Sequence, residues 1–145
     1  MNHERYVMEK AILCAVMSHE GQVDKGGLPY ILHPMAVMLS LPATDYDART
    51  VAILHDVVED TSTTLENLSV WLPEKLLNAV DAMSKRQRES NRDYWTRCKR
   101  NEIAARVKVA DMRHNSSLER LACLTYAEQQ YLSEKYKEAL AFFQQ

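Results

Sequence analysis

The sequence of 145 residues contains few of the residues that break helices. It has three glycines and four prolines, and its runs of β-branched residues are short. This scarcity argues against a fold of short strands and tight turns, because glycine and proline supply much of the turn chemistry that such a fold needs. Apolar residues instead recur at steps of three and four, which is the spacing of helices with one buried face. The sequence therefore predicts an all-α fold.

The predicted helices cover most of the chain. With 46% hydrophobic residues, residues 1–145 are expected to form one domain, a single bundle of about seven or eight helices. Favourable helix starts are Thr63 or Thr64, Pro34 and Pro73. The expected helical spans are 3–20, 33–41, 46–59, 64–71, 73–83, 90–100, 102–117 and 125–143.

Cysteine pairs and long apolar runs are also missing. Cys14, Cys98 and Cys123 are widely separated and form no CxxC pair, so neither a disulfide framework nor a structural zinc site is indicated. Charge interrupts every apolar stretch before it reaches the roughly 18 residues of a membrane span. The stretch MNHERYVMEK is polar and does not show the pattern of a signal peptide. We therefore expect a cytoplasmic protein without a membrane partner.

The charges are unevenly distributed, although the net charge is only −2. Residues 85–113 hold ten Lys or Arg against four acids, and residues 45–66 hold six acids against one Arg. An acidic segment suits a divalent cation and a basic segment suits a phosphate-bearing ligand, whereas the alternative is two solvated helix faces. Nucleic acid is not expected as a partner, because the overall charge is negative and no platform of interleaved aromatics is visible.

The stretch VAILHDVVEDT, residues 51–61, places charge inside an apolar run. On a helix, Val51, Leu54 and His55 share one face, so His55 points to the core and Asp56 lies at its edge. An unpaired carboxylate in an apolar setting is costly, but a divalent metal would use both groups as ligands. The alternative is a core histidine that its neighbouring carboxylate satisfies.

Two further segments add candidate ligands. In residues 102–121 the helical spacing turns Asp111 toward the interior, on one stripe with Val107 and His114. His33 precedes Pro34 at a helix start. Two histidines and two carboxylates suit Mn²⁺, Fe²⁺ or Mg²⁺, and zinc also stays open.

These residues carry a family resemblance. The ordered set His33, His55-Asp56 and Asp111 resembles the H…HD…D signature of the HD-domain metal-dependent phosphohydrolases. The longer motifs GQVDKGGLPYILHP, HDVVEDTSTTLENL and VKVADMRHN resemble the hydrolase domain of the RelA/SpoT family and the small alarmone hydrolases, over roughly residues 8–121. The resemblance implies the all-α HD fold and removal of the 3′-pyrophosphate from guanosine 3′,5′-bis(diphosphate), or ppGpp, which gives GDP and pyrophosphate.

The resemblance also implies roles for individual residues. The metal ion, Mn²⁺ in that family, would be held by His33, His55, Asp56 and Asp111. Glu59 and Asp60 match an acidic pair that positions the attacking water and takes its proton, which is the chemistry a carboxylate near a metal performs. The expected substrate-binding residues are Lys25, Tyr30 and Asn115, together with Lys85, chosen from the basic segment because lysine is a usual phosphate partner.

Two positions depart from the family pattern. Asp24 stands where alarmone hydrolases typically have an arginine that helps to hold the nucleotide, and Met112 directly follows the ligand aspartate. Three functions therefore stay open: ppGpp hydrolysis, hydrolysis of another nucleotide or phosphorylated small molecule, and sensing of a nucleotide without catalysis. The C-terminal segment 125–145 is expected to pack as a helix, and a homodimer is one option for it.

Overall fold

The all-α prediction is confirmed in the computed structural model, which describes residues 2–145. These residues form ten helices and no strand; Val23 and Pro29 make one isolated antiparallel bridge. The helices are α1 (His3–Ser18), α2 (Leu32–Ser40), α3 (Tyr46–Leu54), α4 (Val57–Asp60), α5 (Leu65–Ser69), α6 (Glu74–Met83), α7 (Asn91–Lys99), α8 (Glu102–Asn115), α9 (Leu118–Leu121) and α10 (Tyr126–Phe143).

The helix number differs from the expectation because of short helices. The span predicted as one helix over 46–59 is divided into α3 and α4, and the four-residue α9 follows α8 where no separate helix was expected. Of the two threonines predicted as helix starts, Thr64 caps α5, with a capping box in which its side chain accepts from the Asn67 N–H and the Asn67 side chain accepts from the Thr64 N–H. Pro73 immediately precedes α6. The other long spans agree with the structure within a few residues.

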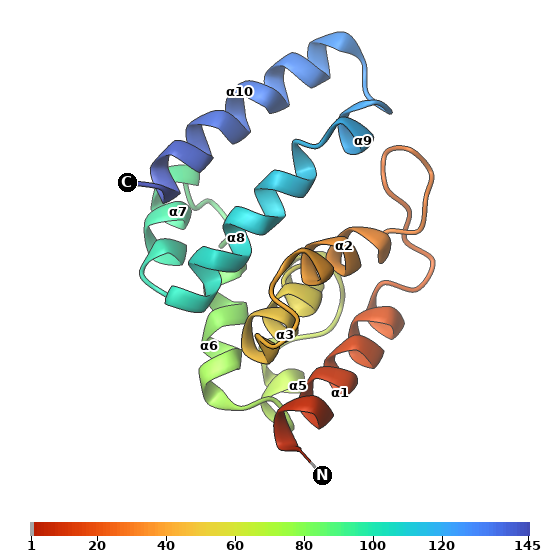
Figure 1. The fold of residues 1–145 in the computed structure, drawn as a ribbon, viewed down its shortest axis with the longest axis vertical. Coiled ribbons are helices and arrows are strands. Elements are labelled where there is room, and N and C mark those ends of the chain that lie inside the picture. The colour runs from red at the N-terminus through yellow and green to blue at the C-terminus, as the bar shows by residue number, and fades with distance from the viewer. Residues whose placement is uncertain (1) are drawn as a thin grey trace.

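Helix α3 is the centre of the core. It packs against α1, α2, α6 and α8, and Figure 1 shows it enclosed by them. Six of its nine residues are buried: Ala48, Thr50, Val51, Ala52, Ile53 and Leu54. Because α3 is surrounded by other helices, His55, which directly follows it, also lies in the interior of the molecule.

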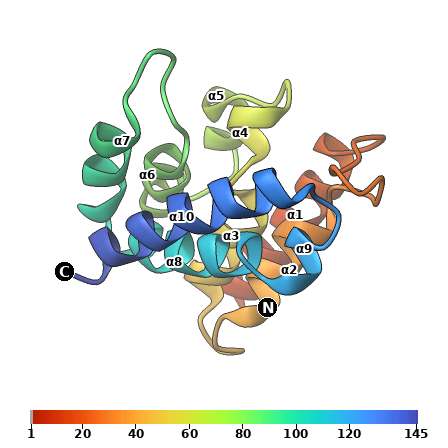
Figure 2. The same ribbon diagram turned by 90° about the horizontal axis from the view of Figure 1, so that it is seen from above.

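The C-terminal helix α10 packs against α7 and α8, as Figure 2 shows from above. Ala139 is buried in this contact, and the rings of Phe142 and Trp95 lie 5.9 Å apart. The expected packing role of this segment is confirmed. Among the described residues, no helix combines the length and the apolar character needed to cross a membrane.

Candidate metal centre and active site

His55 and Asp56 lie at the break between α3 and α4. His55 caps the C-terminus of α3, and its Nδ1 donates to the Ala52 carbonyl at 2.6 Å. The neutral ring therefore carries its lone pair on Nε2. This Nε2 is buried, has no hydrogen-bond partner in the described chain, and yet lies 3.0 Å from Asp56 Oδ2 and 3.3 Å from Asp111 Oδ1. A lone pair facing two carboxylate oxygens at this range requires a cation between them, either a proton or a metal ion.

His33 and Asp111 complete the cluster from two other helices. His33, on α2, places Nε2 at 2.9 Å from Asp111 Oδ1 on α8 and at 3.8 Å from Asp56 Oδ2. His33, His55 and Asp111 are each at most 3% exposed, and their ligand atoms all lie within 4.8 Å of one another. The four residues predicted as ligands therefore converge on one buried point, and their two imidazoles and two carboxylates fit a divalent metal.

The cluster is strongly polarised. Burial opposes ionisation of Asp56, but the charge of His55 outweighs it and holds the pKa of Asp56 at about 2. Burial likewise opposes ionisation of Asp111, and Lys108 and His55 outweigh it, so the pKa of Asp111 is well below its usual range. Both carboxylates are therefore ionised at neutral pH, which is the form that a metal requires.

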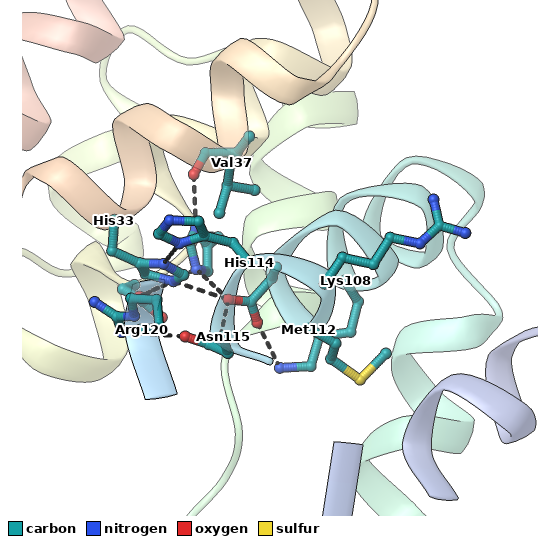
Figure 3. Close-up of polar contacts among 12 residues, drawn as sticks. His33, Val37, Lys108, Met112, His114, Asn115 and Arg120 are labelled. Atoms are coloured by element: carbon teal, nitrogen blue, oxygen red, sulfur yellow. Dashed lines mark hydrogen bonds and ion pairs between the residues drawn. The ribbon is translucent and has the colours of Figure 1, made fainter. Parts of the chain in front are cut away.

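Lys108 is a partly buried partner of the cluster that sequence reasoning missed. Its side chain is 16% exposed, and its Nζ donates to Asp111 Oδ2 at 2.9 Å from one turn earlier on α8. Asn115, one turn later, donates to Asp111 Oδ1 at 3.0 Å; Figure 3 shows both side chains turned to this carboxylate. The only sequence signal was the three-residue spacing from Lys108 to Asp111, which also fits an exposed ion pair.

Two cluster residues have further hydrogen-bond partners. The rings of His33 and His114 are stacked, with their Nδ1 atoms 2.7 Å apart, so His33 directs its Nε2 into the cluster (Figure 3). The Tyr30 hydroxyl donates to Asp56 Oδ2. Burial and the Asp56 charge raise the pKa of the Tyr30 phenol, so the hydroxyl keeps its proton. Such outer hydrogen bonds orient metal ligands.

The acidic pair Glu59 and Asp60 lies one helical turn past Asp56. Carboxylate oxygens of the three residues lie within 4.8 Å of one another. The Lys85 backbone N–H donates to Glu59 Oε1 at 2.7 Å and fixes that side chain. Partial burial and the charges of Asp56 and Glu59 raise the pKa of Asp60 to about 6. Asp60 is therefore more basic than an ordinary aspartate.

A cavity of about 750 Å³ opens beside the cluster. This volume lies in the range of small-molecule sites. Of the predicted substrate residues, Lys25, Tyr30 and Asn115 line it, and so does the metal-ligand candidate His33. The glycine-containing loop 21–30 forms part of its wall. The loop is closed by hydrogen bonds from Asp24 N to Leu28 O and from Tyr30 N to Gln22 O. It is therefore an ordered wall of the cavity, and not merely a connection between helices.

Lys85 lies elsewhere. It is not among the residues lining the cavity, and its Nζ donates to Asn91 Oδ1 at 2.7 Å. Glu59 and Asp60 do not line the cavity either, and they approach the cluster through Asp56. Two cations of the cavity wall, Arg120 and Lys135, were not anticipated, because nothing in the sequence near them indicates that α9 and α10 border the loop.

Comparison with known proteins agrees with this geometry. No family model matches the chain. The chain is 36% identical over 88 residues to the bifunctional (p)ppGpp synthase/hydrolase SpoT of Escherichia coli, an alignment covering 59% of this chain and 12% of that protein. It is 35% identical over 120 residues to a probable GTP pyrophosphokinase of Mycobacterium leprae, which covers 75% of this chain and 15% of that protein. The chain thus spans about one seventh or less of the length of these relatives.

A solved structure shows the fold. It is described as a metazoan ortholog of SpoT that hydrolyzes ppGpp, and it matches with a TM-score of 0.75 at 22% identity, covering 94% of this chain and 84% of the other. The chain is related to the RelA/SpoT hydrolase domain. The predicted HD fold is thereby confirmed, and the RelA/SpoT motifs quoted from the sequence coincide with the cluster and the cavity wall.

Proposed function

We propose that this protein is a metal-dependent phosphohydrolase that removes the 3′-pyrophosphate from ppGpp. The observation that carries the proposal is the convergence of His33, His55, Asp56 and Asp111 beside a nucleotide-sized cavity. The activities for which the RelA/SpoT relatives are named support the choice of substrate.

The metal ligands in this proposal are His33, His55, Asp56 and Asp111, and the ion is Mn²⁺. The unpartnered Nε2 of His55 and the mixed nitrogen and oxygen donor set fit such an ion better than they fit a purely hydrogen-bonded core. When bound, a divalent ion polarises a phosphoryl oxygen and lowers the pKa of a coordinated water.

The side chains around the cluster accept a proton, orient the water and bind the substrate. Water attacks the phosphorus bonded to the ribose 3′ oxygen, that phosphorus–oxygen bond breaks, and GDP and pyrophosphate result. Asp60 accepts the proton that the water loses, for which its raised pKa is suited, and the 3′ oxygen takes a proton from solvent. Glu59, held by the Lys85 N–H, orients the water. Lys25, Tyr30 and Asn115 position the nucleotide in the cavity.

A second candidate is hydrolysis of a different phosphorylated nucleotide on the same cluster. Asp24, a cavity-lining residue, favours it, because an anion stands where the resemblance led us to expect an arginine. The metal chemistry and the ligand residues are the same in both cases. Only the groups that the cavity wall recognises differ.

The test is release of pyrophosphate and phosphate from ppGpp and from a panel of nucleotides by the Mn²⁺-loaded protein. Asp56→Ala is the inactive control, and Asp60→Asn is expected to lower kcat by about 10² to 10⁴ while the metal still binds. Pyrophosphate release from ppGpp that is lost in Asp56→Ala supports the proposal. Turnover of another nucleotide alone favours the second candidate, and no turnover of any compound contradicts both.

A further inference from the structure

Asp24 and Arg120 form an ion pair across the cavity wall. Asp24 lies in the loop and Arg120 in α9, and Arg120 Nη1 is 3.6 Å from Asp24 Oδ2. Both residues line the cavity, and their side chains are only 17% and 24% exposed. The pair therefore belongs to the surface that a bound nucleotide meets.

Asp24 cannot easily turn away from this position. Its Oδ1 accepts the backbone N–H groups of Gly26 at 2.9 Å and Leu28 at 3.0 Å. These bonds shape the turn of the loop and hold the carboxylate in place. A phosphate that binds Arg120 must therefore share the guanidinium with a fixed carboxylate.

Arg120 is also tied to the metal cluster. Its Nη2 donates to Asn115 Oδ1 at 3.1 Å, and Asn115 donates in turn to Asp111 (Figure 3). The guanidinium thus keeps its place whether or not a phosphate is present. It is a preformed cation on the wall, but a neighbouring anion already compensates it.

The other charges leave little attraction for a phosphate chain outside the cluster. The lining cations are Lys25, Arg120 and Lys135, and the lining acids are Asp24 and Glu119. Arg120, one of the three cations available to a second phosphate group, is already paired with the Asp24 carboxylate. A multiply charged phosphate there experiences like-charge repulsion at short range.

We propose that the Asp24–Arg120 pair sets the substrate preference of this site, by disfavouring nucleotides that carry a multiply charged phosphate chain away from the reacting group. The inference rests on the proposed function. Among 3′-pyrophosphorylated guanosines, turnover then falls as the negative charge at the 5′ position rises, and ppGpp is a substrate but not the best one.

The test compares three compounds that share the 3′-diphosphate and differ at the 5′ position, which carries a hydroxyl, a monophosphate or a diphosphate. Pyrophosphate release is measured for each. In the unaltered protein kcat/KM is expected to fall as the 5′ charge rises. Asp24→Asn keeps an oxygen for the Gly26 and Leu28 N–H groups but removes the charge. This variant is expected to raise kcat/KM for the 5′-diphosphate relative to the 5′-hydroxyl compound by on the order of tenfold.

Two controls assign the effect to the pair. Glu119→Gln removes an acid from the same wall without releasing Arg120, and it is expected to shift the ratio much less. Arg120→Gln leaves Asp24 uncompensated, so it is expected to lower the ratio further, and Asp24→Asn in that background is expected to reverse this fall. An unchanged ratio in Asp24→Asn, or an equal shift in Glu119→Gln, overturns the inference. Failure of the proposed function is distinguishable, because then none of the three compounds releases pyrophosphate.

Discussion

The ion pair between Lys108 and Asp111 contributes both to the stability of the fold and to the charge of the cluster. Burial alone would lower the pKa of Lys108, but the Asp111 charge outweighs it and raises that pKa well above its usual value. Both groups are therefore charged inside the protein. Removing one partner of such a pair leaves an uncompensated buried charge, which costs more than the pair contributes when intact.

Asp111→Asn is accordingly expected to destabilise the metal-free protein by about 3 to 5 kcal/mol. Urea denaturation with a chelator present measures this without a contribution from bound metal. The double variant Asp111→Asn with Lys108→Met is expected to recover much of the loss, because the stranded ammonium is gone. Equal stabilities of the single variant and the unaltered protein would show that the pair is not desolvated.

A variant of Tyr30 can show whether its hydroxyl supports a metal ligand or whether the side chain serves only in packing. Tyr30→Phe removes only the hydroxyl that donates to Asp56, so we expect metal affinity to fall by about tenfold with little change in fold. Isothermal titration with Mn²⁺ measures this. Tyr94→Phe is the matched control, because its hydroxyl donates to the Met83 carbonyl and is expected to affect stability but not metal affinity. Equal metal affinities of Tyr30→Phe and the unaltered protein would assign Tyr30 to packing.

At the scale of elements, the sequence shows which helices form but not where they break. The apolar period of 46–59 continues across His55, yet the chain leaves the helix there, with Asp56 at φ −102° and ψ −3°. The break turns the side chains of His55 and Asp56 into the cluster. A periodic pattern of apolar residues does not predict such a break. That His33, His55, Asp56 and Asp111 lie together was predictable because their spacings are local to each helix and the motifs resemble a family.

The partners that sequence reasoning missed are all fixed by tertiary contacts. Lys108 resembles an ordinary exposed lysine until α8 is packed against its neighbours, and Arg120 lies on a four-residue helix too short to give a period. The stacking of His114 on His33 joins α8 to α2. The residues that surround the cluster are therefore determined by contacts between helices, whereas the four cluster residues can be recognised from local sequence motifs.

A bidentate ion pair helps to hold the segment between α6 and α7. Arg97 donates to Glu89 through Nε at 3.0 Å and through Nη2 at 2.9 Å, and Nη2 also donates to the Ser84 carbonyl at 2.7 Å. The hydrogen bonds from Arg97 hold the pKa of Glu89 at about 2. A carboxylate with a folded pKa below its unfolded value stabilises the fold above the unfolded pKa, and this contribution is lost as the pH falls through the folded pKa.

Glu89→Gln is therefore expected to lower the free energy of unfolding by about 1 kcal/mol at pH 7. The deficit relative to the unaltered protein should shrink between about pH 4.5 and pH 2, where Glu89 itself becomes protonated. Urea denaturation at a series of pH values measures both curves. A deficit that stays constant down to pH 3 would show that charge at Glu89 is not its source.

At the scale of the whole molecule, the cluster joins elements that are distant in sequence. His33 comes from α2, His55 and Asp56 from the break between α3 and α4, and Asp111 from α8. In the metal-free form, two ionised carboxylates lie beside the buried Nε2 of His55, which has no hydrogen-bond partner among residues 2–145. An ion that binds all four ligands would therefore tie three packed helices together at the centre of the fold.

Mn²⁺ is accordingly expected to raise the melting temperature by several degrees. A ligand that binds only the folded state at a hundred times its Kd adds about 2.7 kcal/mol to stability. For a chain of this size, that corresponds to several degrees in Tm. Thermal unfolding is measured with the chelated protein, after addition of Mn²⁺, and after renewed chelation, which should return the Tm to its first value.

The control for this prediction is Asp56→Asn, which removes one ligand charge while keeping the size of the side chain. Its Tm is expected to respond little to Mn²⁺, because one of two anionic ligands is lost. Mg²⁺ is expected to raise the Tm of the unaltered protein less than Mn²⁺ does, since imidazole ligands suit Mn²⁺ better than the oxygen-seeking Mg²⁺. A Tm that rises equally in both proteins would place the ion on the surface acids. An unchanged Tm in both would contradict a metal centre formed by α2, the break between α3 and α4, and α8.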